Sequence, residues 1–134
     1  MRDLSGFDPF FKSEAFGVVG ASTNRDKYGN KVLRCYLQHS YKVYPVNPRA
    51  DKIEGVVSVA TLSDLPPNVK SISVITPPAI TEKIVDEAIL RGIKSIWMQP
   101  GSQSQAAIDK ALKHGIQVIA DGSCILVALG FKDV

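Results

Sequence analysis

Gly20-Ala21-Ser22 follows an apolar run and precedes a helix-like pattern, a position where proteins often hold a phosphate group. Glycine leaves the backbone open to close approach, and serine offers a hydroxyl and an amide. A helix that begins just after such a turn directs a partial positive charge toward it, and Lys27 could add a full charge. The run lacks the three glycines of a full dinucleotide fingerprint. It therefore predicts an anion site, with a plain tight turn at Gly20 and a helix cap at Ser22 as the alternative.

A second polar segment, Asn47-Pro48-Arg49, follows the next apolar run. Sites for NAD usually place an acidic residue here to bind the ribose 2′-hydroxyl, but no acid occurs before Asp51. Arg49 instead favours a phosphorylated ribose, as found in NADP or in coenzyme A. A solvated loop arginine is the alternative interpretation.

Two further segments, Thr76-Pro77-Pro78 and Gln99-Pro100-Gly101, also follow apolar runs. Thr76 is suited to a helix N-cap and Pro77 to a first helical position. The paired prolines would also make a flat, rigid apolar wall for an adenine ring or a pantetheine chain. Gln99 to Gly101 would likewise serve both as a helix start and as a rim.

Five short apolar runs precede these polar segments, and each is typical of a strand buried on both faces. The predicted strands are Phe16–Val19, Lys42–Tyr44, Ile72–Ile75, Ser95–Met98 and Gln117–Ala120.

Helix-periodic segments separate the predicted strands. We expect a short helix capped by Asp8 with Pro9 at its first position, a helix from Tyr28 to His39, one around Ile80–Ile89 that stops at Gly92, and one opened by a Ser102/Gln105 capping box that stops at Gly115. Residues 57–65 are expected to hold a short strand and a helical turn.

Alternation of strand and helix at this spacing predicts parallel pairing with right-handed crossovers. The expected fold is α/β, a three-layer sandwich around a Rossmann-like parallel sheet of about five strands in the order 2-1-3-4-5. In such sheets ligands bind outside the carboxyl ends of the strands, where the winding reverses.

The length of 134 residues predicts one domain over residues 1–134. A net charge of +3 without a run of basic and aromatic residues argues against nucleic acid. No apolar run approaches the roughly 18 residues of a membrane helix, and Met1–Lys12 does not have the pattern of a secretory signal. We expect a cytosolic protein, with a mitochondrial address left open.

Catalytic and metal-binding patterns are weak. The two cysteines, Cys35 and Cys124, lack metal-ligand spacing, and Cys124 is interpreted as a buried thiol. His39 and His114 fall at the ends of predicted helices, where a structural role is favoured. Trp97 lies within a predicted strand and is assigned to the core. The sequence therefore predicts no catalytic residues and no metal.

Six segments together resemble the small CoA-binding domain proteins, whose fold is also the N-terminal domain of the succinyl-CoA synthetase alpha subunit. In chain order they are Val19–Ser22 with Gly29, Val43–Pro48, Thr61–Pro66, Thr76–Pro78, Trp97–Gly101 and Asp121–Cys124. They cover roughly residues 8–125. The last segment departs from the family, which often carries Arg or Asn before the cysteine, and this leaves the role of Cys124 open.

The resemblance implies that coenzyme A lies across the strand ends, with its pyrophosphate first, then its phosphorylated ribose, its adenine and its pantetheine. The residues implied to bind it are Gly20, Ala21, Ser22, Asn24, Lys27, Asn47, Pro48, Arg49, Thr76, Pro77, Ile80, Gln99, Pro100 and Gly101.

Three functions remain open from the sequence. The first is a module that binds coenzyme A or an acyl-CoA without catalysis of its own. The second is an NADP-binding oxidoreductase or redox sensor, and the third is the CoA-binding subunit of a split acyl-CoA synthetase that pairs with a separate chain. A homo-oligomer is also left open, because the apolar segment 125–129 could cover an edge or meet a second copy.

Overall fold

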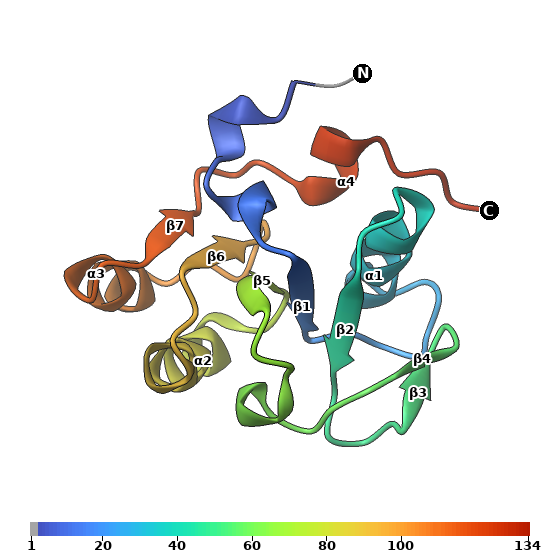
Figure 1. Ribbon diagram of the computed structural model, residues 1–134, viewed down its shortest axis with the longest axis horizontal. Helices are drawn as coiled ribbons and strands as arrows, with labels where there is room; N and C mark the ends of the chain where they lie inside the picture. The colour runs from blue at the N-terminus through green and yellow to red at the C-terminus, as the bar shows by residue number, and fades with distance from the viewer. Residues whose placement is uncertain (1–2) are drawn as a thin grey trace.

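Five parallel strands form the centre of the structure, a computed structural model that describes residues 3–134 (Figure 1). The strands are β1 (Ala15–Val19), β2 (Val43–Val46), β5 (Val69–Val74), β6 (Ser95–Met98) and β7 (Gln117–Ile119). They lie in the order β2-β1-β5-β6-β7, and neighbouring strands pair parallel. This confirms the predicted sheet and its strand order.

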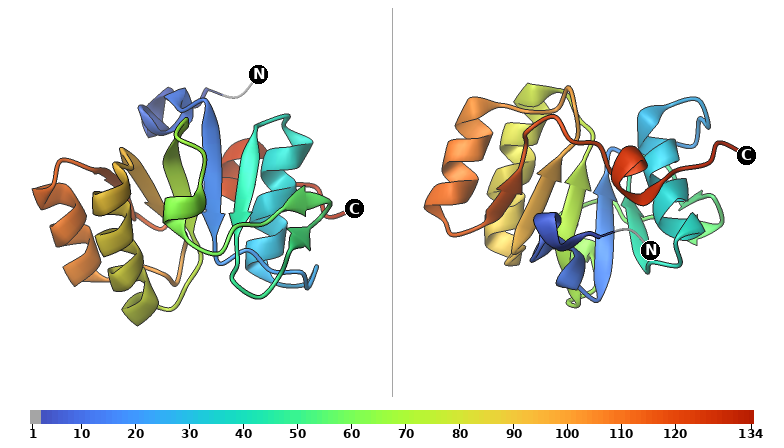
Figure 2. Two further views of the ribbon diagram at one scale, coloured as in Figure 1. Left: turned by 60° about the horizontal axis from the view of Figure 1, so that its bottom comes forward. Right: turned by 90° about the horizontal axis from the view of Figure 1, so that it is seen from above.

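Helices cover both faces of the sheet (Figure 2). They are α1 (Tyr28–Gln38) and α4 (Ile125–Leu129) on one face, and α2 (Pro78–Arg91) and α3 (Gln105–Lys113) on the other. Alternate side chains of β1 divide between the two hydrophobic cores, since Phe16 and Val18 pack on the α1 side and Val19 packs on the α2 side. The predicted three-layer sandwich is confirmed.

The winding of the chain reverses at β1, which lies between β2 and β5. The crossover through α1 passes over one face, and those through α2 and α3 pass over the other. The loops that follow β1 and β5 therefore diverge at the carboxyl edge, as expected for a ligand crevice at a switch point.

Small elements complete the fold. A hairpin pairs β3 (Lys52–Ile53) with β4 (Val56–Val57), and 3₁₀ turns form at Ser5–Phe7, Phe10–Lys12 and Leu62–Asp64. Between the hairpin and the last turn, Val59 pairs with the edge strand β2, donating its N–H to the Pro45 carbonyl at 3.0 Å. The helical turn expected within residues 57–65 is thus present, whereas the expected strand is reduced to Val57 at the end of β4 and the single bridge at Val59. Pro45 itself is tolerated because β2 is an edge strand.

Helix starts differ from the sequence-based expectation. The N-cap of α3 is Ser104, whose Oγ accepts from the Ala107 N–H at 3.3 Å, and not Ser102. The Ser102 hydroxyl is buried and bonds the carbonyl oxygens of Val74 and Gln99, so it cannot cap the helix.

The other two starts shift by one residue. Pro77 is the N-cap of α2 and Pro78 its first residue, while the Thr76 hydroxyl bonds that of Thr81 at 2.7 Å. Near the N-terminus, Pro9 is the cap of the 3₁₀ turn, so Asp8 does not have the expected capping role.

The segment predicted to cover an edge or meet a second copy forms α4, whose Ile125 and Leu129 are buried in the core that includes α1.

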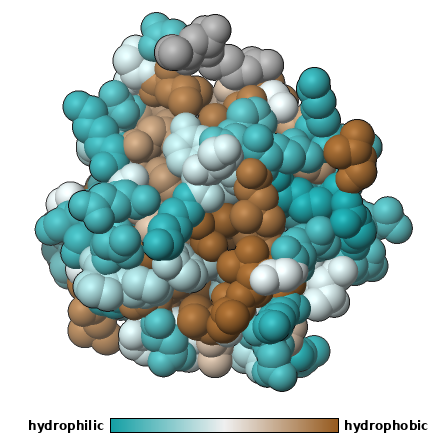
Figure 3. Space-filling view, turned by 45° about the vertical axis from the view of Figure 1, so that its right-hand side comes forward, coloured by the Kyte–Doolittle hydropathy of each residue, from teal (hydrophilic) through white to brown (hydrophobic). Residues whose placement is uncertain are grey.

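Hydrophobic side chains form a strip through the middle of the face shown in Figure 3, flanked by hydrophilic ones. Within residues 3–134, no helix has the length and hydrophobicity needed to cross a bilayer.

Candidate functional site

A cavity of about 630 Å³ opens at the carboxyl edge of the sheet, between the loops after β1, β2 and β5 and the side of α2. The predicted site residues that line it are Gly20, Ala21, Asn47, Pro48, Arg49, Thr76, Pro77 and Ile80. They come from three loops that are far apart in the sequence and, for Ile80, from the first turn of α2, and the parallel sheet brings them to one place.

A shallower hollow of about 280 Å³ adjoins the cavity and shares Ile75, Thr76 and Pro77 with it. Its other side contains the predicted residues Pro100 and Gly101. The two hollows together make a continuous surface from the β2 loop to the β6 loop.

Gly20 has a structural reason to be glycine. Its φ angle is +94°, and a Cβ at this position would lie 2.0 Å from the carbonyl oxygen of Ile75 at the end of β5. Any side chain would therefore clash with backbone, whether or not a phosphate approaches the turn.

Asn47 connects two of the loops that form the cavity. Its Nδ2 donates to the Ala21 carbonyl at 2.9 Å, and its Oδ1 accepts from the Arg49 N–H at 2.7 Å. The side chain thereby holds the β1 loop against the β2 loop and positions the backbone that carries the Arg49 guanidinium.

Ser22, Asn24 and Lys27 lie on the loop between β1 and α1, outside the lining of the cavity. The Ser22 Oγ accepts from the Asn24 N–H at 3.1 Å, and the Asn24 Oδ1 accepts from the Asp26 N–H at 3.0 Å. These bonds build the turn. Lys27 is the exposed N-cap of α1 and makes no capping bond with its side chain.

Gln99 differs from the expectation that it forms part of the rim, because its side chain is fully buried. Its Oε1 accepts from the Tyr28 hydroxyl at 3.1 Å and from the Ile125 N–H at 3.0 Å. Its Nε2 is buried without a hydrogen-bond partner among the described residues. Gln99 thus joins α1 and α4 to β6 from the inside.

Cys124 is half-buried rather than buried, and its Sγ lies 2.6 Å from the Tyr28 hydroxyl. Burial, together with this bond, raises the pKa of Tyr28 above its ordinary value, so the hydroxyl stays a neutral donor. Burial also raises the pKa of the Cys35 thiol to about 12. Cys35 is therefore an inert core thiol, whereas Cys124 is only half-buried.

Several lining residues were not predicted from the sequence. They are Val19, Val46, Ala60, Thr61, Leu62, Ile75, Ile84 and Glu87. The helical period gave a usable signal for two of them, because Ile84 and Glu87 follow Ile80 by four and seven residues and share its helix face.

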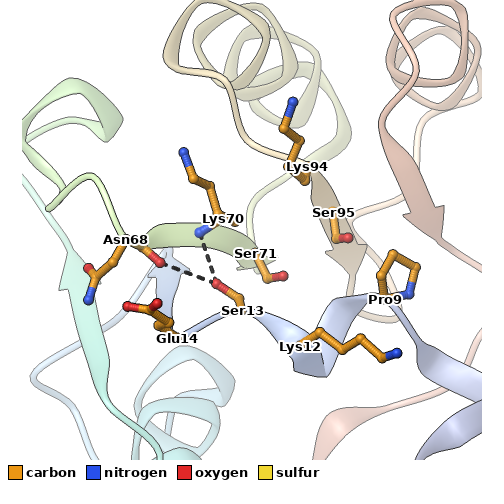
Figure 4. Close-up of a pocket in the computed structure, with 9 residues that line it drawn as sticks. All are labelled: Pro9, Lys12, Ser13, Glu14, Asn68, Lys70, Ser71, Lys94 and Ser95. Atoms are coloured by element: carbon orange, nitrogen blue, oxygen red, sulfur yellow. Dashed lines mark hydrogen bonds between the residues drawn. The ribbon is translucent and has the colours of Figure 1, made fainter.

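Another cavity, of about 330 Å³, lies at the opposite, amino edge of the sheet (Figure 4). Figure 4 shows its Ser13 hydroxyl bonded to Lys70 and Asn68, and the Ser71 hydroxyl donates to the Phe10 carbonyl at 2.6 Å. These bonds fasten the N-terminal segment to β5, so packing explains this hollow.

The two histidines and Trp97 lie where the sequence analysis expects them. His39 and His114 are the C-caps of α1 and α3, and each ring lies within hydrogen-bonding distance of a carbonyl oxygen of its own helix. Trp97 is fully buried, and its indole N–H donates to the Ser123 carbonyl at 3.0 Å.

The proteins similar to this chain include a protein of similar length and much longer ADP-forming ligases. A conserved hypothetical protein from Pyrococcus furiosus is 36% identical with a TM-score of 0.81, over 85% of this chain and 97% of that one. The alpha subunit of ADP-forming acetate–CoA ligase II from the same organism is 28% identical over 84% of this chain. ADP-forming acetate–CoA ligase II from Archaeoglobus fulgidus is 28% identical over 88% of it.

The chain spans only 27% of the length of the first ligase and 18% of the second. The family profile described as "CoA binding domain" matches residues 14–130, which include all five sheet strands and every residue predicted to bind the ligand. With this match over most of its length, the chain belongs to the CoA binding domain family.

Proposed function

We propose that this chain binds coenzyme A or an acyl-CoA across the carboxyl edge of its sheet, without catalysis of its own. The observation that carries the proposal is the 630 Å³ cavity, where three loops converge beside one arginine, Arg49. Membership of the CoA binding domain family supports the same ligand.

Each part of the ligand has a proposed subsite. The pyrophosphate meets the turn from Gly20 to Asn24 and Lys27, near the uncapped N-terminus of α1. The phosphorylated ribose lies beside Asn47-Pro48-Arg49. The adenine packs toward Thr76–Ile80, and the pantetheine runs over Pro100 and Gly101, above the buried Gln99.

Thermal unfolding in the presence of ligands tests the proposal, because a ligand that binds only the folded state raises the unfolding midpoint. Coenzyme A and acetyl-CoA are expected to raise it, and NAD is not. A larger shift with NADP than with coenzyme A would support the alternative of an NADP-binding oxidoreductase or sensor, for which Arg49 would bind the 2′-phosphate. No shift with any of these would contradict the proposal.

A second proposed function is that of a CoA-binding component that works with a separate synthetase chain in the cytosol. The similarity to the alpha subunit of an ADP-forming ligase favours it. Affinity purification of the tagged chain from its native host is expected to recover a nucleotide-binding partner in stoichiometric amount. Recovery of the chain alone would argue for independent CoA binding.

A further inference from the structure

Glu87 is the one acidic residue that lines the carboxyl-edge cavity among the residues that the structure describes. It lies on the same face of α2 as Ile80 and Ile84, seven residues after Ile80. At a rise of about 1.5 Å per residue, the Cα of Glu87 is about 10 Å farther along the helix than that of Ile80, and helical side chains tilt back toward the helix N-terminus. Because α2 begins at the carboxyl edge and runs back along the sheet, Glu87 belongs to the end of the cavity farther from that edge.

The other acidic side chains of α2, Glu82 and Asp86, both have partners. The Glu82 carboxylate accepts from the Ser104 hydroxyl at 2.8 Å, and Asp86 pairs with Lys110 at 2.7 Å. Both bonds are made to α3. Within residues 3–134, no hydrogen bond or ion pair is formed by the side chain of Glu87, a half-buried residue. A carboxylate only accepts hydrogen bonds, so one without a partner beside a cavity favours a hydrogen-bond donor in the ligand.

The charges of the cavity orient the ligand. Arg49 lies on the loop after β2, at the carboxyl edge, whereas Glu87 lies at the end of the cavity farther from that edge, and Leu62 and Ile84 also line the cavity. A phosphate is attracted to Arg49 and repelled by Glu87. The end of the cavity beside Glu87 therefore fits a flat, apolar group that carries an N–H donor.

We infer that Glu87 accepts a hydrogen bond from the 6-amino group of the adenine ring and so selects adenine over 6-oxopurines. This inference rests on the proposed function and adds a specificity-determining residue to it. Hypoxanthine and guanine present a carbonyl oxygen at position 6, which would face the carboxylate as a second acceptor. A site built to pair with one group rejects an analogue that leaves its polar atoms unpaired.

Isothermal titration with two matched nucleotides tests the inference. Adenosine 3′,5′-bisphosphate and inosine 3′,5′-bisphosphate share the ribose and both phosphates and differ only in the purine. One hydrogen bond to a charged group corresponds to a preference of about tenfold to a hundredfold for the adenosine compound in the wild-type protein.

The variant Glu87→Gln is expected to reduce this preference to about threefold or less, because its amide can either donate or accept. Glu87→Ala, which removes both abilities, is expected to do the same. Asp86→Asn removes one negative charge from the same helix, on the side facing α3, and is expected to retain the full preference.

Equal affinity of the wild-type protein for the two bisphosphates would overturn the inference, as would an undiminished preference in Glu87→Gln. A parallel titration with coenzyme A separates the role of Glu87 from the proposed function. Binding of coenzyme A without discrimination between the bisphosphates removes only the role of Glu87. Failure of the wild-type protein to bind coenzyme A removes the proposed function and this role with it.

Discussion

The first turn of α1 lies so close to the β1 loop that a Cβ on Gly29 would be 2.0 Å from the carbonyl oxygen of Gly20. Gly20 is itself pressed against the Ile75 carbonyl. Three backbone segments, from β5, the β1 loop and α1, are therefore in direct contact beneath the candidate site. Their shape is set by backbone contacts before any ligand arrives.

The contact predicts that Gly29→Ala is strongly destabilising. Helix propensity alone would make this change favourable by about 1 kcal/mol. The methyl group would instead meet backbone that has no room to move, and we expect a loss of more than about 4 kcal/mol in the free energy of unfolding. Urea denaturation measures it. Gly6→Ala, with no atom within 4 Å of the added Cβ, is the control and should change stability by less than about 0.5 kcal/mol. A stabilised Gly29→Ala protein would disprove the contact.

Arg49 is predicted to bind the 3′-phosphate of coenzyme A. Arg49→Ala should weaken the binding of coenzyme A by about tenfold to a hundredfold, which is the loss expected for charge-assisted hydrogen bonds. It should weaken the binding of dephospho-CoA by less than about threefold. Titration calorimetry with both ligands gives the comparison. Lys113→Ala, which removes one positive charge at the end of α3, should leave both affinities unchanged. Equal losses for the two ligands would show that Arg49 does not contact this phosphate.

The two cysteines are predicted to differ in reactivity. With a pKa raised to about 12 by burial, Cys35 stays a protonated, unreactive thiol at about pH 8, whereas Cys124 is only half-buried. Brief treatment of the folded protein with iodoacetamide should add one group, on Cys124, as peptide mass spectrometry would show. Cys124→Ser should abolish the fast modification. Labelling of Cys35 at a similar rate would contradict the burial described here.

Gln99 is predicted to stabilise the fold through its two accepted hydrogen bonds. Gln99→Ala leaves the Tyr28 hydroxyl and the Ile125 N–H without this acceptor. Each loss should lower the free energy of unfolding by about 1–3 kcal/mol. Adding Tyr28→Phe removes one of the stranded donors, so the double variant should cost about 1 kcal/mol less than the sum of the single variants. Denaturant unfolding of the four proteins measures this coupling. Strict additivity would show that the two side chains do not interact. Gln105→Ala, at an exposed position, is the control for loss of a glutamine.

Local patterns predicted the sheet well because each one reports burial along a single segment. Short β-branched runs such as that ending in Val19 must be covered on both faces, and their alternation with helical segments leaves few topologies. The same patterns placed Gly20, Arg49 and Pro77 at strand ends, and the parallel sheet brings strand ends together. Helix caps were less predictable, since the capping-box pattern favours Ser102, and only the burial of Ser102 in the folded chain leaves the cap to Ser104.

The sequence by itself thus determined the α/β class, the strand order and the edge at which the polar loops meet, because periodicity and turn residues are local properties. Only the tertiary structure decided that Gln99 points inward to Tyr28 and that Glu87 faces the cavity while Asp86 faces α3. The direction of a side chain depends on contacts between segments that are distant in the chain, and no single segment encodes those contacts.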